Sequence, residues 1–404
     1  MANQNRPNQN REVWITGIGL VSSFGEGAEH HWNILGGDKA PAPIIDQENF
    51  APYGVHPLPE MDWSLQIPRR GDQRQMENWQ RLGTYSAGLA LDDAGVKENE
   101  ELVSTMDLVV AAGGGERDIE SDREILAQAV DHNDRERLLI ERLPNDLRPT
   151  LFLAQLSNLL AGNISIVHKV TGSSRTYMGE ENAGVTVIEN AVARIAAGQS
   201  THALVGGAYN AERPDLLLIQ ELGHYLARDC VDPILLRQAK GGGMVPGTAG
   251  AFLVIEDAEF ARARNATPYA KISGVTSDLG KRDDASTATR VTDLFDRLAK
   301  DGTSIDAVIS GMSGVSDVTA QEIDFLEKQL GAQIPVRAIT SMLGHSMEGN
   351  FPASIALAAM ALRNNKFFPA FEAAEKPAPA NPNSILVTSF GHRHGEGLGL
   401  VEKV

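Results

Sequence analysis

Cysteine is almost absent from this chain, because Cys230 is the only one among 404 residues. A single thiol cannot form an intrachain disulfide, and it excludes a zinc site built from cysteines. Cys230 lies in the run Ala-Arg-Asp-Cys-Val-Asp. We interpret it as a structural or incidental thiol.

Positive charge and long apolar runs are scarce as well. The chain has 36 Lys and Arg against 53 Asp and Glu, a formal net charge of −17, which argues against nucleic acid as a partner because phosphate binding needs clustered basic residues. No stretch approaches the roughly 20 apolar residues that cross a bilayer. Residues 1–10 are polar and lack the apolar core of a signal peptide. We therefore expect a short disordered leader at residues 1–10, no membrane span and a cytoplasmic location.

Short β-rich apolar runs alternate with longer helical patterns along the chain. This alternation predicts an α/β architecture with buried strands. Each half contributes four expected strands, which suggests a duplicated fold. The expected strands are residues 13–18, 108–112, 203–206 and 251–255 in the first half, and residues 270–275, 307–310, 336–339 and 385–388 in the second.

Five segments in a fixed order carry a resemblance to a known family. They are the strand and Gly-rich turn at residues 11–22, the helix, glycine cap and buried strand at 191–208, the Gly-rich segment 243–256, Ser341-Met-Leu-Gly-His345 and Ser389-Phe-Gly391. Together they span nearly the whole chain and resemble the β-ketoacyl-ACP synthases of the thiolase-like superfamily. The resemblance implies a duplicated thiolase-like five-layer α-β-α-β-α fold, with an N-terminal half at residues 11–256 and a C-terminal half at 257–404. It also implies an active site between the halves and a two-fold dimer.

The resemblance indicates that the family's nucleophile is replaced in this chain. In these synthases a cysteine thiolate at a helix N-terminus accepts an acyl group from its carrier, because the backbone N–H groups and the helix dipole lower its pKa. Counting back from Gly198 without gaps places Glu181 at that position. A carboxylate is a poor acyl acceptor, since an acyl anhydride is readily hydrolysed and forms uphill from a thioester.

Other catalytic positions implied by the resemblance are changed too. No histidine lies between His224 and His345, so the first of the family's two catalytic histidines is missing, and with it one donor to a thioester enolate. Thr340 stands where the family usually has a lysine, and His392 replaces the phenylalanine that gates the pocket. Of the catalytic set only His345 remains. The implied substrate pocket comprises Thr340, Ser341, Phe390, Gly391 and His392.

We expect Glu181, His345 and His392 to converge in this fold, with Arg393 nearby. A buried glutamate at a helix N-terminus stays ionised when it is paired with a histidine, so we predict a polar, inert plug. The three side chains could instead bind zinc or iron, but their spacing is no recognised ligand motif, and we expect no metal and no cofactor. The carboxylate could also act as a general base that decarboxylates a malonyl group, as glutamine-substituted members of the family suggest, although those members keep both histidines.

These features predict a non-condensing protein of fatty-acid or polyketide biosynthesis, comparable to the chain-length factor that pairs with an active synthase. One alternative is an active 3-oxoacyl-ACP synthase or a malonyl-ACP decarboxylase. Another is a non-catalytic scaffold that binds acyl chains. The expected partners are an acyl carrier protein and either a second copy of this chain or an active ketosynthase.

Basic clusters and one charged segment are candidates for these contacts. An acidic carrier needs a basic patch, and residues 69–70, 135–142 and 262–264 are candidates, each of which could equally be a solvated face. The charged segment 117–147 interrupts the first half, and its apolar positions allow helices rather than simple disorder. This segment could shape an acyl channel near the dimer interface or form a solvated insertion. Its apolar positions are Ile125, Leu126, Leu139, Ile140 and Leu143.

Overall fold

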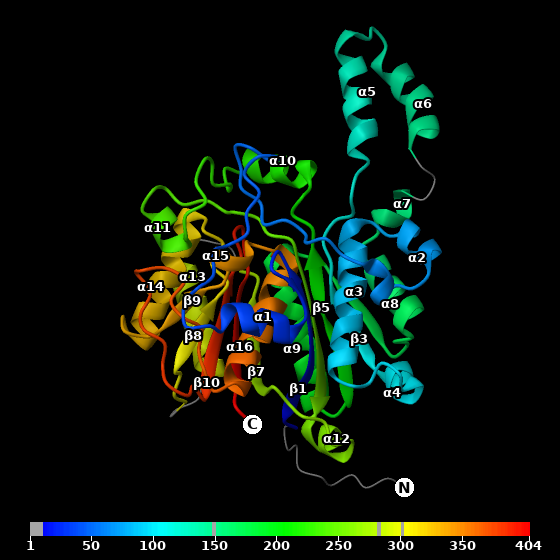
Figure 1. Ribbon diagram of the computed structural model, residues 1–404. Coiled ribbons are helices and arrows are strands. Elements are labelled where there is room, and N and C mark those ends of the chain that lie inside the picture. The colour runs from blue at the N-terminus through cyan, green and yellow to red at the C-terminus, as the bar shows by residue number, and fades with distance from the viewer. Residues whose placement is uncertain (1–10, 148–150, 281–283, 300–302) are drawn as a thin grey trace.

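The computed structural model describes residues 11–147, 151–280, 284–299 and 303–404. The leader expected at residues 1–10 lies outside these ranges. Strands run through the centre of the molecule, with helices on either side and between them (Figure 1). Within the described ranges, no helix is both long and apolar enough to cross a membrane.

The described strands form one sheet in the order β4-β3-β5-β6-β1-β7-β11-β10-β8-β9, with β2 paired to β1. In the first half the strands are β1 (Val13–Ser22), β2 (Gly25–Glu26), β3 (Asp107–Ala111), β4 (Ser174–Tyr177), β5 (His202–Tyr209) and β6 (Ala249–Asp257). In the second half they are β7 (Ala270–Asp278), β8 (Ala307–Ser310), β9 (Val336–Ala338), β10 (Ser384–Phe390) and β11 (Glu396–Glu402).

The strand order repeats between the two halves. Without β2, each half has five strands. Their order in the sheet is β4-β3-β5-β6-β1 in the first half and β9-β8-β10-β11-β7 in the second. Numbered along the chain within each half, both orders are 3-2-4-5-1. In both halves the fifth strand is antiparallel to its two neighbours, and the other pairs are parallel. A short antiparallel pairing of residues 13–15 with residues 270–272 joins the halves. The duplicated α/β fold expected from the sequence is therefore confirmed.

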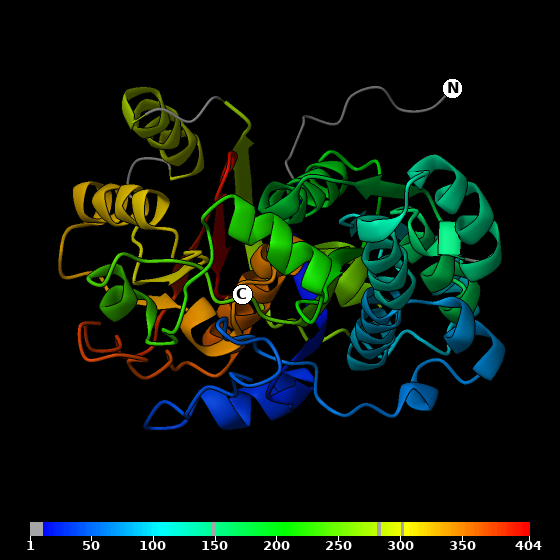
Figure 2. The same cartoon turned by 90° about the horizontal axis from the view of Figure 1, so that it is seen from above.

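Helices form three layers around these half-sheets (Figures 1 and 2). α3 and α8 cover the outer face of the first half, α13 and α14 cover that of the second, and α9 and α16 pack between the halves. Residues 350–362 of α16 are all buried, as a helix that is apolar on every side requires. The largest apolar core combines α9, α16 and strands of both halves.

The helices of the first half are α1 (Ala28–Leu35), α2 (Arg70–Gln75), α3 (Asn78–Asp93), α4 (Glu100–Thr105), α5 (Ile119–Asp131), α6 (Arg135–Asp146), α7 (Leu151–Ala154), α8 (Leu159–His168), α9 (Glu180–Ala196), α10 (Pro214–Leu222) and α11 (Ile234–Gln238). Those of the second half are α12 (Ala258–Ala263), α13 (Asp284–Leu298), α14 (Ser316–Leu330), α15 (Thr340–Leu343) and α16 (Asn350–Arg363). Two 3-10 turns, η1 (Trp63–Leu65) and η2 (Met347–Gly349), complete the described elements.

The expectation of four strands in each half was wrong, because β4, β11 and the two-residue strand β2 were not predicted. β4 is the polar run Ser-Arg-Thr-Tyr at the edge of the sheet, where its side chains are exposed or partly buried. β11 alternates glycine with leucine. A Cβ atom at Gly397 would lie 2.5 Å from the side chain of Val185, and one at Gly399 would lie 3.0 Å from Phe351. Close packing against α9 and α16 therefore explains these glycines.

The charged segment 117–147 forms two helices, α5 and α6, that project away from the body of the molecule (Figure 1). The prediction of helices rather than disorder is confirmed. Ile125 and Leu138 are buried, whereas five other apolar side chains of the pair are exposed. These five are Leu126, Val130, Leu139, Ile140 and Leu143.

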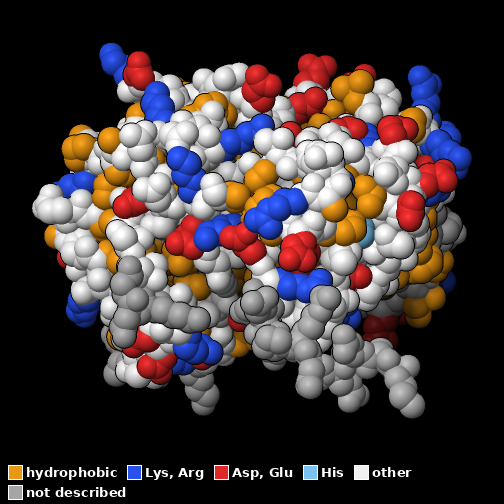
Figure 3. All heavy atoms as spheres, turned by 90° about the horizontal axis from the view of Figure 1, so that it is seen from below, with side chains coloured by type: hydrophobic (Ala, Val, Ile, Leu, Met, Phe, Trp, Pro, Cys, Tyr) orange, Lys and Arg blue, Asp and Glu red, His pale blue; other side chains and the backbone are white. Residues whose placement is uncertain are grey.

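The three basic candidates differ in how far their charges are neutralised. In 135–142, Arg137 pairs with Glu141, and Arg142 pairs with Glu124 and Asp146. In 262–264, Arg262 pairs with Glu12 and Arg264 with Glu256. Basic and acidic side chains are interspersed on the face seen from below (Figure 3). Arg69 and Arg70 form no ion pair with any other described residue.

Candidate functional site

A buried carboxylate and two histidines meet at the N-terminus of α9. Glu181 lies in the first turn of this helix and is 1% exposed. Its Oε1 accepts hydrogen bonds of 2.7 Å from His345 Nε2 and 2.7 Å from His392 Nδ1. The backbone N–H of His392 also donates to Oε1, at 3.2 Å. The structure thus brings together the three residues that were expected to converge.

Each side chain of this cluster is fixed by its local backbone. α9 begins after Gly179, whose φ of 141° suits a residue without a Cβ atom. His345 follows the short helix α15, and its N–H donates to the carbonyl of Val245 at 2.9 Å. His392 stands in the turn between β10 and β11, which is closed by a 2.7 Å hydrogen bond from Gly391 N to the carbonyl of Gly395. Three segments far apart in the sequence, the start of α9 and the turns that carry His345 and His392, therefore meet at Oε1 of Glu181.

Charge balance keeps Glu181 ionised. Burial raises the pKa of this carboxyl, but the charge of His392 and the hydrogen bonds from both histidines outweigh it and bring the pKa well below its usual range. Burial lowers the pKa of His392, and the charge of Glu181 outweighs it and raises that pKa. The N-terminal end of the helix dipole stabilises the same negative charge. The cluster is therefore a carboxylate–imidazolium pair with a second histidine bonded to it.

Glu180 and Arg393 extend the cluster toward the surface. Glu180 Oε2 lies 4.0 Å from His392 Nε2, and Glu180 Oε1 lies 3.6 Å from Arg393 Nη1. The His392 ring packs edge-on against Tyr225, with centroids 4.8 Å apart. The sequence had placed Arg393 near the cluster, and it lies there.

The cluster offers three metal-ligand atoms, all within 4.8 Å of one another. Metal-bound histidines normally donate their second ring N–H to a carboxylate or carbonyl. Here His345 Nδ1 and His392 Nε2 are buried and have no hydrogen-bond partner in the part of the chain that the structure describes. The arrangement thus lacks the outer support of a metal centre and is better described as a hydrogen-bonded ion cluster.

The other predicted pocket residues are engaged elsewhere. Thr340 Oγ1 donates to the carbonyl of Met312 at 2.5 Å, and Ser341 Oγ accepts from Ile234 N at 3.1 Å. Phe390 is buried beside Phe325, with ring centroids 5.9 Å apart. Gly391 closes the turn that presents His392. Of the five predicted pocket residues, only His392 bonds to Glu181, and Gly391 belongs to the turn that presents it.

A cavity of about 120 Å³ lies beside the first turn of α9, and our sequence analysis did not predict it. Glu348, in the turn after His345, contributes a buried carboxylate to its wall. The one signal in the sequence was an acidic residue in the run Ser-Met-Glu-Gly, directly after a candidate catalytic histidine. The lining residues are Trp79, Gly113, Gly114, Glu180, Ala208, Tyr209, Asn210, Arg213, Leu216, Gln220, Met347 and Glu348.

Comparisons with known proteins agree with the fold. The family "Beta-ketoacyl synthase, N-terminal domain" matches residues 10–261. The chain is 27% identical over 369 residues to the tetracenomycin polyketide synthase ketoacyl synthase beta subunit of Streptomyces glaucescens, covering 87% of this chain and 86% of that one. It is 26% identical over 390 residues to 3-oxoacyl-[acyl-carrier-protein] synthase 2 of Rhizobium meliloti, covering 88% and 87%. The ishigamide ketosynthase/chain length factor structure superposes with a TM-score of 0.79 at 20% identity, covering 98% of this chain and 100% of that one, which shows a shared fold.

Proposed function

The chain belongs to the β-ketoacyl synthase family, and we propose that it is a non-condensing subunit that pairs with a cysteine-bearing synthase of fatty-acid or polyketide biosynthesis. In this role it completes the dimer and shapes the acyl tunnel, as a chain-length factor does. Relatives described as a ketoacyl synthase beta subunit and as a ketosynthase/chain length factor support this proposal.

The state of Glu181 carries the proposal. We take it to occupy the position of the family's nucleophile, at the start of the helix that follows β4. Its Oε1 is bonded by two imidazoles at 2.7 Å, and its pKa is held well below the usual range. A weakly basic carboxylate with one oxygen engaged in this way is a poor nucleophile toward a thioester. Residues 308–317 also contain no histidine, so a second donor to the enolate is missing there.

The same geometry disfavours a malonyl-ACP decarboxylase. A general base works best with a pKa near the operating pH and with hydrogen-bond reach to the proton it removes. Glu181 has a lowered pKa, and both of its 2.7 Å contacts are to protein nitrogens.

An acyl-binding scaffold is disfavoured by the cavity beside α9. Its wall carries Glu348 and Gln220, both buried. An alkyl chain placed there would leave buried polar groups without partners, which costs about 1–3 kcal/mol for each group.

Free surfaces on the first half support a subunit partner. β4 pairs with β3 alone among the described strands, so one edge of the sheet is open. Met178, directly after β4, and Phe152 in α7 are exposed, as are the apolar side chains of α5 and α6. Exposed apolar groups of this number are typical of protein interfaces. Residues 69–70 remain the proposed docking point for an acyl carrier protein, because the other two basic clusters are largely neutralised within the chain.

Native mass spectrometry of this chain mixed with a cysteine-bearing synthase encoded in the same genome tests the proposal. We expect a one-to-one heterodimer to form in preference to both homodimers. Two unmixed homodimers after prolonged incubation and after co-expression would contradict a partner role.

A further inference from the structure

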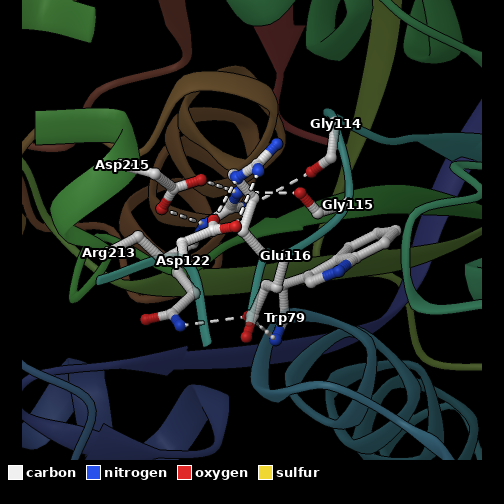
Figure 4. Close-up of polar contacts among 9 residues, drawn as sticks. Trp79, Gly114, Gly115, Glu116, Asp122, Arg213 and Asp215 are labelled. Carbon is white, nitrogen blue, oxygen red and sulfur yellow. Dashed lines mark hydrogen bonds and ion pairs between the residues drawn. The ribbon is translucent and has the colours of Figure 1, made fainter. Parts of the chain in front are cut away.

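A second cavity of about 120 Å³ lies in the second half of the chain, between α14, β9 and residues 374–376. It differs from the cavity beside α9, whose one basic side chain is bound within the chain. There Arg213 donates to the carbonyls of Gly114 at 3.2 Å and Gly115 at 2.8 Å, and it forms a two-point ion pair with Asp215 (Figure 4). The second cavity, which we call the α14 cavity, has apolar walls and carries charged side chains on its open side.

Apolar side chains form most of the walls of the α14 cavity. Four of them are only partly buried, so they keep surface that a ligand can reach. These four are Leu235, Ile323, Ile334 and Val336. Apolar cavities of about 150 Å³ take up benzene, because water finds no hydrogen-bond partners in them. The α14 cavity is slightly smaller and therefore suits a small branched aliphatic group.

Two carboxylates of the segment 371–376 hold these walls in place. Glu372 accepts hydrogen bonds of 3.0 Å from the backbone N–H groups of residues 235–236 in α11. Glu375 accepts a hydrogen bond of 3.3 Å from a backbone N–H of β9 and lies 3.5 Å from Arg337 Nη1. The Glu375 side chain is 2% exposed, so it closes the wall and offers no group to a ligand. The cavity is thus preformed by contacts within the chain.

The open side of the α14 cavity carries one charge of each sign. Glu327 of α14 is exposed and Lys376 is partly buried, and both line the cavity. Neither forms an ion pair with any other residue that the structure describes. Gly331 and Ala332, which follow the C-terminal end of α14, line the cavity too, and the negative end of the helix dipole favours a cation there. The open side therefore favours a positive group beside Glu327 and a negative group beside Lys376.

We propose that the α14 cavity binds a free α-amino acid with a branched aliphatic side chain, such as leucine. The aliphatic side chain enters the apolar cavity. The α-ammonium group pairs with Glu327 at the end of α14, and the α-carboxylate pairs with Lys376. Each of the three parts of the ligand then contacts the part of the site that matches its chemistry.

Other ligand classes match fewer of these features. A short fatty acid pairs with Lys376 but also meets Glu327 and the negative end of α14. An alkyl amine pairs with Glu327 but meets the ammonium group of Lys376. A long acyl chain exceeds a volume of about 120 Å³. An amino acid uses the apolar walls and both charges.

Saturation-transfer NMR of the full chain, titrated with leucine, tests the site. We expect saturable one-to-one binding. Isocaproate lacks the ammonium group and isoamylamine lacks the carboxylate, so each should bind about threefold more weakly, as expected for the loss of one surface ion pair. Glycine lacks the aliphatic side chain and should bind at least about tenfold more weakly, because burial of that group supplies most of the affinity.

Two variants assign the charges of the ligand to their partners. Glu327→Gln should weaken leucine binding about threefold and remove the preference for leucine over isocaproate. Lys376→Gln should weaken it by a similar factor and remove the preference for leucine over isoamylamine. Ala332→Phe places a bulky side chain at an exposed position of the lining and should abolish binding.

Asp324→Asn and Lys328→Gln are the matched controls. Both residues are exposed on α14 and line a different groove, so these variants should bind leucine as the unaltered chain does. The proposal is overturned if leucine does not bind, if isocaproate and isoamylamine bind as tightly as leucine, or if the controls weaken binding as much as Glu327→Gln and Lys376→Gln. The inference does not rest on the partner role, and its failure would leave that role untouched.

Discussion

His392 donates a 2.7 Å hydrogen bond from Nδ1 to Oε1 of Glu181 across 211 positions of sequence. Nε2 of His345 reaches the same oxygen atom at the same distance. The first turn of α9 therefore ends in a closed ion cluster rather than in a free nucleophile. Under the proposed function, the chain keeps the fold of a condensing enzyme but does not perform the covalent step.

The buried ion cluster should contribute measurably to stability. Glu181→Ala leaves His392 buried without its anion, and breaking one side of a buried pair costs about 3 kcal/mol or more. Urea unfolding of Glu181→Ala, of His392→Ala and of the double variant measures the coupling. We expect the double variant to be clearly less destabilised than the sum of the single variants. Additive effects would show that the two side chains do not form a pair.

The contribution of the cluster to the free energy of unfolding should depend on pH, and the pKa shifts fix the direction of that dependence. The pKa of Glu181 is lowered in the folded chain, so its contribution is present above the ordinary value of 4.5 and is lost as the pH falls through the folded value. The pKa of His392 is raised, so its contribution is full below 6.5 and is lost as the pH rises through the folded value. The stability difference between the unaltered chain and Glu181→Gln should therefore be largest between about pH 4.5 and 6.5. A difference that keeps growing toward pH 9 would contradict the assignment.

Restoring the thiol alone should not restore condensation. Glu181→Cys supplies a nucleophile at a helix N-terminus, but the second donor to the enolate remains absent. We expect the variant to be acylated by acyl-ACP, with acylation visible as an added mass on the intact protein, while β-ketoacyl product from malonyl-ACP stays at background. Cys230 provides the internal control, because the unaltered chain should gain no acyl group. Condensation by Glu181→Cys would mean that the missing histidine is not needed here.

The exposed apolar residues of the projecting pair α5 and α6 should lie in the subunit interface. Val130 is 72% exposed and Ile140 is 73% exposed. Val130→Ser with Ile140→Ser should weaken the heterodimer at least tenfold, because burial of two such side chains is worth about 1.5–3 kcal/mol each. Leu218→Ser on α10 is the control, since Leu218 is also exposed but lies outside the pair. An unchanged dissociation constant in sedimentation experiments would place the interface elsewhere.

Much of the fold was predictable because its signals are local. Most of the eight predicted strands are buried apolar runs, and each prediction coincides with an observed strand to within a few residues. β4 was not predicted because an edge strand does not need an apolar run. β11 was not predicted because its glycines are required by close packing against helices that are distant in the sequence. The meeting of Glu181, His345 and His392 followed from the family's residue order. Glu348 and its cavity did not, because the resemblance assigns no polar residue to that turn and only the folded chain brings Trp79, Gln220 and Glu348 to one wall.

The most direct test of a non-condensing partner is mass-spectrometric analysis of β-ketoacyl products from acyl-ACP and malonyl-ACP. The reaction is run with this chain alone, with a cysteine-bearing synthase from the same genome alone, and with both. We predict no product from this chain alone, and a product distribution from the mixture whose chain length differs from that of the synthase alone. Product from this chain alone would contradict the inert site, and an identical distribution with and without it would contradict the partner role.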